Sequence, residues 1–244
     1  SSEFPIPTVH AHPDRARALE RAGAELEAGW LPVVLRESAN PDIAPGKPGY
    51  FEAARFVALL NIPEHHDRSQ GEVHASGNPH IHLDARNFLP IAQEFSARLS
   101  SLDPANADFY QERLKTFTRD WRAALARWEK LAAPLRGQSI LVQHDAFPYL
   151  NAWLGMKQIG ALESKPGMEP GIPHLSGLLQ KISQHQVRMV IRADYQDSRP
   201  AEWIAGRAYI PAVVLPFTVG GSDKSQDLFS LFDDILRRLL EGLE

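Results

Sequence analysis

Residues 139–162, SILVQHDAFPYLNAWLGMKQIGAL, decide the fold class. Two apolar runs of strand length, at 139–145 and 157–162, flank a segment whose apolar residues recur at helical spacing. A helix between two strands lets them pair in parallel, so this stretch predicts a β-α-β unit. The pattern continues downstream, with strands expected at 187–194 and 210–217 and helices at 174–186, 200–208 and 225–243. The C-terminal part therefore predicts an α/β fold with a parallel sheet covered by helices.

The ends of these strands are the expected place for a ligand. In open parallel sheets, ligands bind in the crevice beyond the carboxyl ends of the strands. Just after the apolar cores of these strands, at 140–142, 159–162, 190–191 and 213–215, stand His144 and Asp145, Glu163, Asp194, and the segment 217–221. His144 is the strongest candidate, because an imidazole at this position points into the crevice. It could equally cap a helix or lie in the core as a hydrogen-bonded polar group.

A long helix is expected just before this part of the chain. Asp103 and Pro104 supply an N-cap and a first-turn proline, and the helix should run to about Leu131. Its apolar stripe consists of Tyr110, Leu114, Phe117, Trp121, Leu125 and Trp128. A helix of about 28 residues is roughly 42 Å long, which is enough to link two lobes. A single long core helix within one domain fits the sequence equally well.

The N-terminal part is less regular. Segment 13–38 is expected to be rich in helix with interruptions at Gly29 and Pro32, and segment 83–102 is expected to form a further helix. The polar stretch 63–79 should be a loop. We therefore expect three parts: an N-terminal lobe at 1–103, a linking helix at 104–134 and a C-terminal α/β lobe at 135–244.

Composition narrows the functional classes. Lys and Arg number 26 against 30 Asp and Glu, a net charge of −4 with no basic stripe, which argues against binding to nucleic acid. No run approaches the ~18 apolar residues that a membrane helix needs. The opening SSEFPIPTVH has no basic and apolar signal region, so a signal peptide is expected to be removed or to lie outside this sequence.

The chain has no cysteine and ten histidines. Disulfides, thiolate catalysis and thiolate metal ligands are thereby excluded, so any metal must be held by nitrogen and oxygen. Five of the histidines fall within 18 residues of one another: His65, His66, His74, His80 and His82. A histidine-rich tract without thiols suits zinc, and less strongly manganese, nickel or copper.

Two pairs of histidines have a spacing that could serve a metal. His80 and His82, like His10 and His12, would project to one side of an extended segment. Such neighbours more often place one ring in a site and the other at its rim. The three histidines of the 63–79 loop could be solvated or could capture metal weakly, and His174 and His185 are expected to be structural or surface residues.

Two segments carry a resemblance to a known family. GNPHIHLDARN (77–87) and VQHDAFPYL (142–150) resemble the NPHxWLDP and HDAFxYF signatures of the zinc and manganese solute-binding proteins of bacterial ABC transporters. Segments 23–55, 162–182 and 212–221 are also similar to a branch of this family, so the resemblance extends from about Gly23 onward. It implies two α/β lobes joined by one long helix, with a metal site in the cleft between them.

The resemblance also implies a set of metal ligands. His80 and His144 match the histidines of the two signatures, whereas His82 takes the place of a tryptophan and should lie near the site. The family's opening strand and helix have no counterpart, so the N-terminal lobe is expected to be shortened. Pro7 stands where the first ligand belongs, and His10 or His12 would have to substitute for it.

The last turn departs from the family as well. The segment LPFTVGG (215–221) lacks the acid that often completes the site, and Asp194 at the neighbouring strand end could replace it. The second nitrogen of each ligating imidazole needs a partner, for which Asp84 and Asp145 are expected.

From these residues and the resemblance we expect a periplasmic or surface-tethered receptor, monomeric and not an enzyme, that captures zinc or manganese and delivers it to an ABC permease. A zinc hydrolase with Glu163 or Asp194 as general base is one alternative. The other is a metal-buffering or adhesion relative that has an incomplete site and no transport role.

Overall fold

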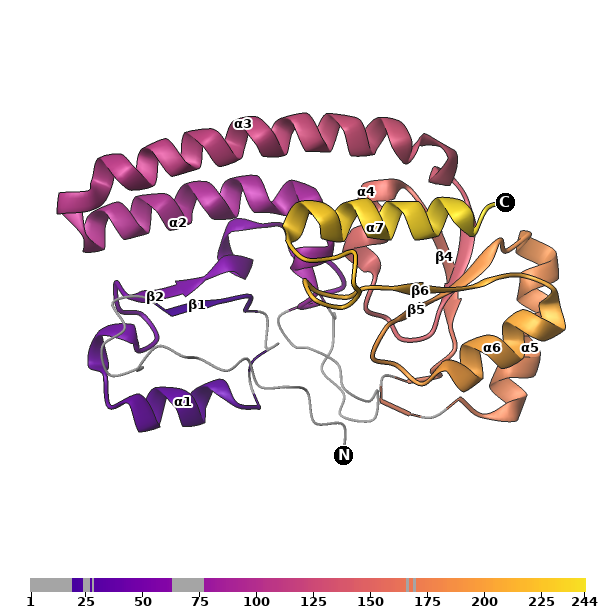
Figure 1. Cartoon of the computed structure of the whole chain (residues 1–244). Coiled ribbons are helices and arrows are strands. Elements are labelled where there is room, and N and C mark those ends of the chain that lie inside the picture. Colours follow the sequence, from indigo (N-terminus) through magenta and orange to yellow (C-terminus); the bar gives the residue numbers. More distant parts are fainter. Residues whose placement is uncertain (1–18, 24–26, 28, 63–76, 166, 169) are drawn as a thin grey trace.

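The computed structural model describes residues 19–23, 27, 29–62, 77–165, 167–168 and 170–244 (Figure 1). A small sheet pairs β1 (Leu19–Arg21) with β2 (Tyr50–Glu52) in parallel. A larger parallel sheet contains β3 (Ser139–Val142), β4 (Lys157–Ala161), β5 (Met189–Ala193) and β6 (Ala212–Leu215) in the order β4-β3-β5-β6. The expected α/β fold with parallel sheets is confirmed.

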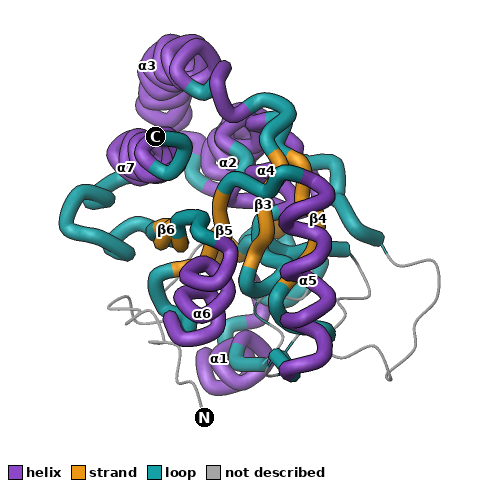
Figure 2. Tube along the Cα trace, turned by 90° about the vertical axis from the view of Figure 1, so that its right-hand side faces the viewer, coloured by secondary structure: helices purple, strands orange, loops and turns teal. Residues whose placement is uncertain are grey.

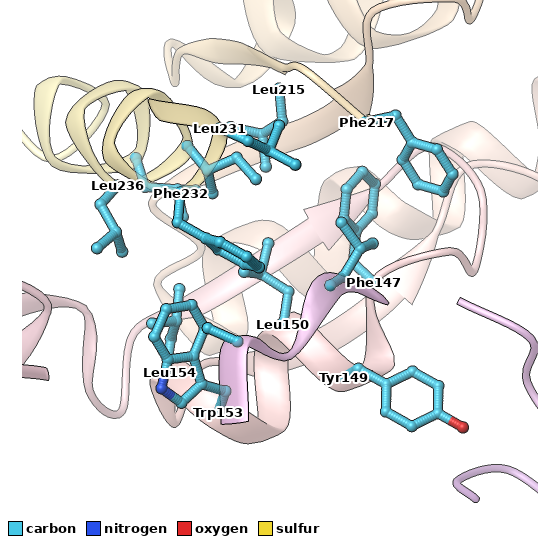
Figure 3. Packing of buried hydrophobic residues seen from close by; sticks show 14 of the residues in the cluster. Phe147, Tyr149, Leu150, Trp153, Leu154, Leu215, Phe217, Leu231, Phe232 and Leu236 are labelled. Carbon is cyan, nitrogen blue, oxygen red and sulfur yellow. The ribbon is translucent and has the colours of Figure 1, made fainter. Parts of the chain in front are cut away.

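Helices cover both faces of the larger sheet (Figure 2). These are α4 (Pro148–Leu154), α5 (Ile172–His185), α6 (Ser198–Ala208) and α7 (Leu228–Glu241). Side chains alternate along a strand, so Leu141 packs with α5 and α6 while Ile140 and Val142 face α4 and α7. Figure 3 shows the second of these layers, in which Phe232 of α7 lies against Trp153 of α4.

The strand order predicts a ligand site beside β3. From β3 the chain moves to one neighbour, β4, and then crosses over to pair β5 on the other side. The direction of winding therefore changes between β3 and β5, and ligands of open sheets bind at such a point. The residues after β3 and β5 are His144 and Asp194, two of the residues selected from the sequence.

Two long helices run side by side along the molecule (Figure 1). They are α2 (Phe88–Leu102) and α3 (Ala107–Leu131), and α3 also contacts α7. Trp121 of α3 donates a hydrogen bond from Nε1 to the carbonyl of Ala85 (2.7 Å), and Trp128 donates to Oδ1 of Asp233 on α7 (2.6 Å). The apolar stripe of α3 thus holds the segment after His80 on one side and the C-terminal helix on the other.

The beginning of the long helix differs from the expectation. A 3-10 turn, Pro104–Asn106, precedes α3, and the side chain of Asp103 makes no capping bond to this turn. Its Oδ2 instead accepts hydrogen bonds from the side chains of Asn106 (2.8 Å) and Tyr110 (2.9 Å). The carboxylate therefore ties the turn to the first turn of α3 through side chains.

The expectation of a helix-rich segment at 13–38 was wrong over Leu19–Arg21, which is strand β1. Pairing with β2 satisfies this backbone, and the carboxylate of Glu27 accepts hydrogen bonds from the amides of Ala22 (2.8 Å) and Gly23 (3.2 Å). A partner 31 positions away overrides the local helical spacing, as the register Leu19↔Tyr50 shows. Helix α1 (Leu31–Ser38) carries Pro32 in its first turn instead of being interrupted there.

Short 3-10 turns complete the described chain, at Pro41–Ile43, Ala53–Phe56, Ile81–Leu83, Ala85–Asn87 and Ala133–Leu135. Two of them follow His80 and replace the first residues of the helix expected at 83–102. Among the described residues, no helix combines the length and the apolar character that a membrane crossing requires.

Candidate metal site

His80 and His144 lie next to each other although 64 positions separate them in the sequence. His80 precedes the 3-10 turn Ile81–Leu83, and His144 follows β3. Their ring centroids are 6.4 Å apart, and the rings meet edge to face at 83°. His80 is 7% exposed and His144 is half-buried. The structure thus brings together one imidazole from each half of the molecule.

Glu163 orients the His144 ring. Its Oε2 lies 2.8 Å from Nδ1 of His144 and accepts a hydrogen bond from the amide of Gly167 (2.8 Å). An ionised carboxylate accepts only, so Nδ1 of His144 carries the proton. A metal would therefore bind this ring at Nε2. Glu163 was selected from the sequence as a strand-end residue, but its partnership with His144 was not foreseen.

His80 has its own neutral partner. Oδ1 of Asn78 lies 2.9 Å from Nδ1 of His80 and accepts a hydrogen bond from the amide of His80 (3.0 Å). Asn78 was not selected from the sequence, although it stands two positions before His80 in the segment 77–87.

Asp84 and Asp145 were expected to orient the imidazoles, but they bond to other groups, so that expectation was wrong. Asp84 forms an ion pair with Arg86 (2.7 Å) and accepts from the Arg86 amide at 2.9 Å. Asp145 accepts from the side-chain amides of Gln158 (2.9 Å) and Asn61 (3.3 Å). Neither aspartate therefore orients a ring, whereas Glu163, which follows the neighbouring strand β4, reaches His144.

His82 lies at the rim of the pair, 6.2 Å from His80 between ring centroids. Its Nε2 donates a hydrogen bond to the carbonyl of Phe217 (3.2 Å). Burial lowers the pKa of His82 to about 4, although the Phe217 carbonyl opposes this change. His82 is therefore neutral at pH 7, and its hydrogen bond holds the loop after β6 against the site.

Phe217 closes the site from the side of β6. Its ring lies 5.2 Å from the His80 ring and 5.1 Å from the His82 ring, and it packs edge to face on Phe147 at 6.0 Å (Figure 3). Asp194 accepts a hydrogen bond from the Phe217 amide through Oδ1 (3.1 Å). The residues that follow β5 and β6 are therefore joined at this edge of the sheet.

Tyr195 contributes a neutral hydroxyl near the same edge. Burial, with the negative charges of Asp194 and Glu163, raises the pKa of Tyr195 to about 12. Its ring contacts Phe217 at 5.4 Å. The phenol stays protonated at physiological pH, so it adds no anionic ligand.

Other candidates cannot be placed in the site. His10, His12, His65, His66 and His74 lie outside the described residues. Within the part of the chain that the structure describes, no group of three His, Asp or Glu side chains could hold a metal by itself. His174 lies 2.9 Å from the Ala161 carbonyl through Nε2, and His185 is exposed at the end of α5. In the described residues, His80 and His144 thus form a pair of candidate ligands and not a complete shell.

Comparison with known proteins gives a family match along nearly the whole chain. The model of the family described as zinc-uptake complex component A, periplasmic, matches residues 7–242. The high-affinity zinc uptake system protein ZnuA of Bacillus subtilis is 23% identical over 220 residues, which cover 88% of this chain and 67% of that protein. The zinc-binding protein AdcA of Streptococcus pyogenes is 25% identical over 187 residues, or 74% of this chain and only 35% of AdcA.

A manganese protein and a solved structure are also similar. The manganese ABC transporter substrate-binding lipoprotein PsaA of Streptococcus pneumoniae is 21% identical over an alignment 248 positions long, which covers 98% of this chain and 76% of PsaA. A crystal structure of ZnuA superposes with a TM-score of 0.76 at 20% identity and covers 99% of this chain and 86% of the ZnuA chain. This structural likeness supports the two-lobe fold.

Proposed function

The chain belongs to the family of periplasmic zinc-uptake components, and on that premise we propose that it binds zinc between its two lobes and delivers the ion to the permease of an ABC transporter. It would act outside the cytoplasm as a monomer. The lobes of this proposal are residues 1–103 and 135–244, with residues 104–134 as the linking segment. Its helix α3 contacts both halves, which supports this division.

The proximity of His80 and His144 is the observation that carries the proposal. Neutral imidazoles bind zinc at ~2.0–2.1 Å in a tetrahedral shell, and a d¹⁰ ion accepts that geometry without strain. Since Nδ1 of each ring is engaged, both would offer Nε2. A nitrogen-rich shell suits zinc better than manganese, which prefers oxygen ligands. Manganese stays the alternative cargo, because the relative PsaA is named for it.

Two further ligands are needed for a tetrahedral shell, and we assign one of them to His10 or His12. Asp194 is our candidate for the other, with a water molecule as the alternative. The Oδ1 atom of Asp194 accepts from the Phe217 amide. The carboxylate would therefore have to coordinate through Oδ2 while it continues to hold the loop. The histidines of the 63–79 loop could deliver metal to this site.

The names of the family and of its relatives describe uptake components, which favours a receptor over the zinc hydrolase considered from the sequence. A buffering or adhesion relative would bind metal without passing it on. Uptake of radioactive zinc by vesicles that contain the cognate permease separates the two. A receptor should stimulate uptake, and a buffering protein should reduce it by sequestration.

Zinc titration of the purified protein tests the binding site itself. We expect one zinc ion per chain in the wild type and at least a tenfold weaker affinity in His80→Ala and in His144→Ala, because each variant removes one ligand. His185→Ala is the matched control, since this histidine is exposed at the end of α5. Wild-type affinity in both site variants would refute the proposed site.

A further inference from the structure

Asn78 bonds both to His80 and to the residue that follows His144. The residue is 8% exposed. Its Oδ1 faces His80, and its Nδ2 donates a hydrogen bond to the carbonyl of Asp145 (2.9 Å), the residue directly after His144. One side-chain amide therefore spans from the ring of His80 to the backbone beside His144.

The backbone of Asn78 is fixed as well. Its amide donates to the carbonyl of Leu60 (2.8 Å), and its carbonyl accepts from the hydroxyl of Tyr149 on α4 (2.8 Å). The same hydroxyl accepts a hydrogen bond from the amide of Leu60 (3.0 Å). The side chain thus starts from a backbone that is already joined to the C-terminal lobe.

The orientation of the Asn78 amide follows from two partners whose roles cannot change. The backbone amide of His80 can only donate, and the backbone carbonyl of Asp145 can only accept. Oδ1 must therefore face His80, and Nδ2 must face Asp145. Because Oδ1 only accepts, the Nδ1 atom of His80 at 2.9 Å must carry the proton. This tautomer leaves the lone pair of the ring on Nε2.

We propose that Asn78 is a positioning residue for the metal, which holds His80 in the Nδ1–H tautomer and ties this ring to the backbone beside His144. The inference rests on the proposed function, because the role is defined by an ion that the two rings share. The Asn78 amide, and not the metal, would then set the spacing between the rings of His80 and His144. The pair would therefore be oriented before zinc arrives.

The tautomer can be measured in the metal-free wild type, where no variant has to fold. Long-range proton–nitrogen NMR spectra of the protein labelled with ¹⁵N-histidine distinguish a protonated Nδ1 from a protonated Nε2, and His80→Ala assigns the signal. We expect a single Nδ1–H form of His80. An Nε2–H form would overturn the proposal.

Two variants separate the hydrogen bonds made by Oδ1 and by Nδ2 of Asn78. Asn78→Leu is close in size and removes both, so we expect a mixed tautomer and a loss of zinc affinity of about 10- to 100-fold, the range typical for partners of metal ligands. Asn78→Asp retains an oxygen that accepts from Nδ1 of His80 but loses the donor to Asp145. It should keep the tautomer and bind zinc more tightly than Asn78→Leu.

Asn61→Gly is the matched control. Asn61 also joins the N-terminal part of the chain to Asp145, by a hydrogen bond to its carboxylate (3.3 Å), and makes no hydrogen bond to a described histidine. Glycine tolerates its positive φ of 53°. Zinc affinity and the His80 tautomer should stay at wild-type values. Loss of affinity in the control equal to that in Asn78→Leu would show a general effect of the contact between lobes and would overturn the positioning role.

The failure of this proposal differs from the failure of the proposed function. If Asn78→Leu binds zinc within about twofold of the wild type while His80→Ala does not, the positioning role is refuted and the metal site stands. If His80→Ala and His144→Ala both bind zinc normally, the proposed function fails, and the positioning role fails with it because no shared ion remains.

Discussion

The carboxylate of Glu163 should set much of the affinity for zinc, and two substitutions isolate its effect. Glu163→Gln keeps an oxygen that can accept from Nδ1 of His144 and removes only the charge. Glu163→Ala removes the charge and the hydrogen bond together. The wild-type contact is 2.8 Å long, and the side chain of Glu163 is 19% exposed.

The magnitude follows from the geometry across the imidazole ring. A zinc ion on Nε2 would lie about 7 Å from the Glu163 carboxylate. The attraction between charges of +2 and −1 at this distance is about 1.2 kcal/mol in water and about 5 kcal/mol at an effective dielectric of 20. Because the group is partly solvated, we expect Glu163→Gln to lose about 1.4–2.8 kcal/mol of binding free energy, or about 10- to 100-fold in affinity.

Competition with a fluorescent zinc chelator at pH 7 measures this loss, and urea unfolding of the metal-free proteins reveals any general damage. Glu163→Ala should bind more weakly than Glu163→Gln, since the ring also loses its orientation. Glu202→Gln, on the exposed side of α6, serves as the control for removal of one negative charge. Wild-type affinity in both Glu163 variants would refute the reasoning.

Three further predictions concern the scaffold. Asp234 is buried, and although burial alone would raise its pKa, hydrogen bonds from Ser222, Arg237 and Arg238 outweigh that effect and lower the pKa. Asp234→Asn should therefore lose about 1–3 kcal/mol of unfolding free energy at pH 7 in urea titrations. The stabilisation by a carboxylate of lowered pKa is lost as pH falls through its pKa in the folded protein, so the difference in stability between wild type and variant should narrow below about pH 4. A difference that does not narrow would contradict this. Trp128→Ala removes a fully buried side chain that packs against Phe232, and it should lower the unfolding free energy by about 3–5 kcal/mol. Thermal unfolding should show a lower midpoint, and an unchanged midpoint would be inconsistent with this packing. Phe217→Ala should weaken zinc binding in the same titration as the Glu163 variants, because the variant removes the ring that packs on both His80 and His82 while the backbone hydrogen bond to His82 remains. Tighter binding would argue against this ring as support for the site.

The larger sheet could be predicted because its strands are buried on both faces and therefore form short apolar runs that local spacing reveals. Strand β1 could not, since its stability depends on pairing with Tyr50–Glu52 far along the chain. The same holds at the site. His80 and His144 could be selected by motif, whereas the partnership of His144 with Glu163 joins residues that follow two different strands and needs the register of the sheet.

The expectations for Asp84 and Asp145 failed for a related reason. Both follow a histidine closely in sequence, but a 3-10 turn directs Asp84 to Arg86, and Asp145 points to Asn61 and Gln158. Asn78 orients a ring where they do not, because its side-chain oxygen bonds to both the backbone amide and the ring of His80, two positions later. Predictions for His10 and His12 concern residues that the structure does not describe, and they stay predictions.

Anomalous scattering at the zinc edge from crystals grown with one equivalent of zinc tests the central claim most directly. A single anomalous peak at about 2.0–2.1 Å from Nε2 of both His80 and His144 is the predicted result. A zinc ion bound elsewhere, with these two rings uncoordinated, would contradict it.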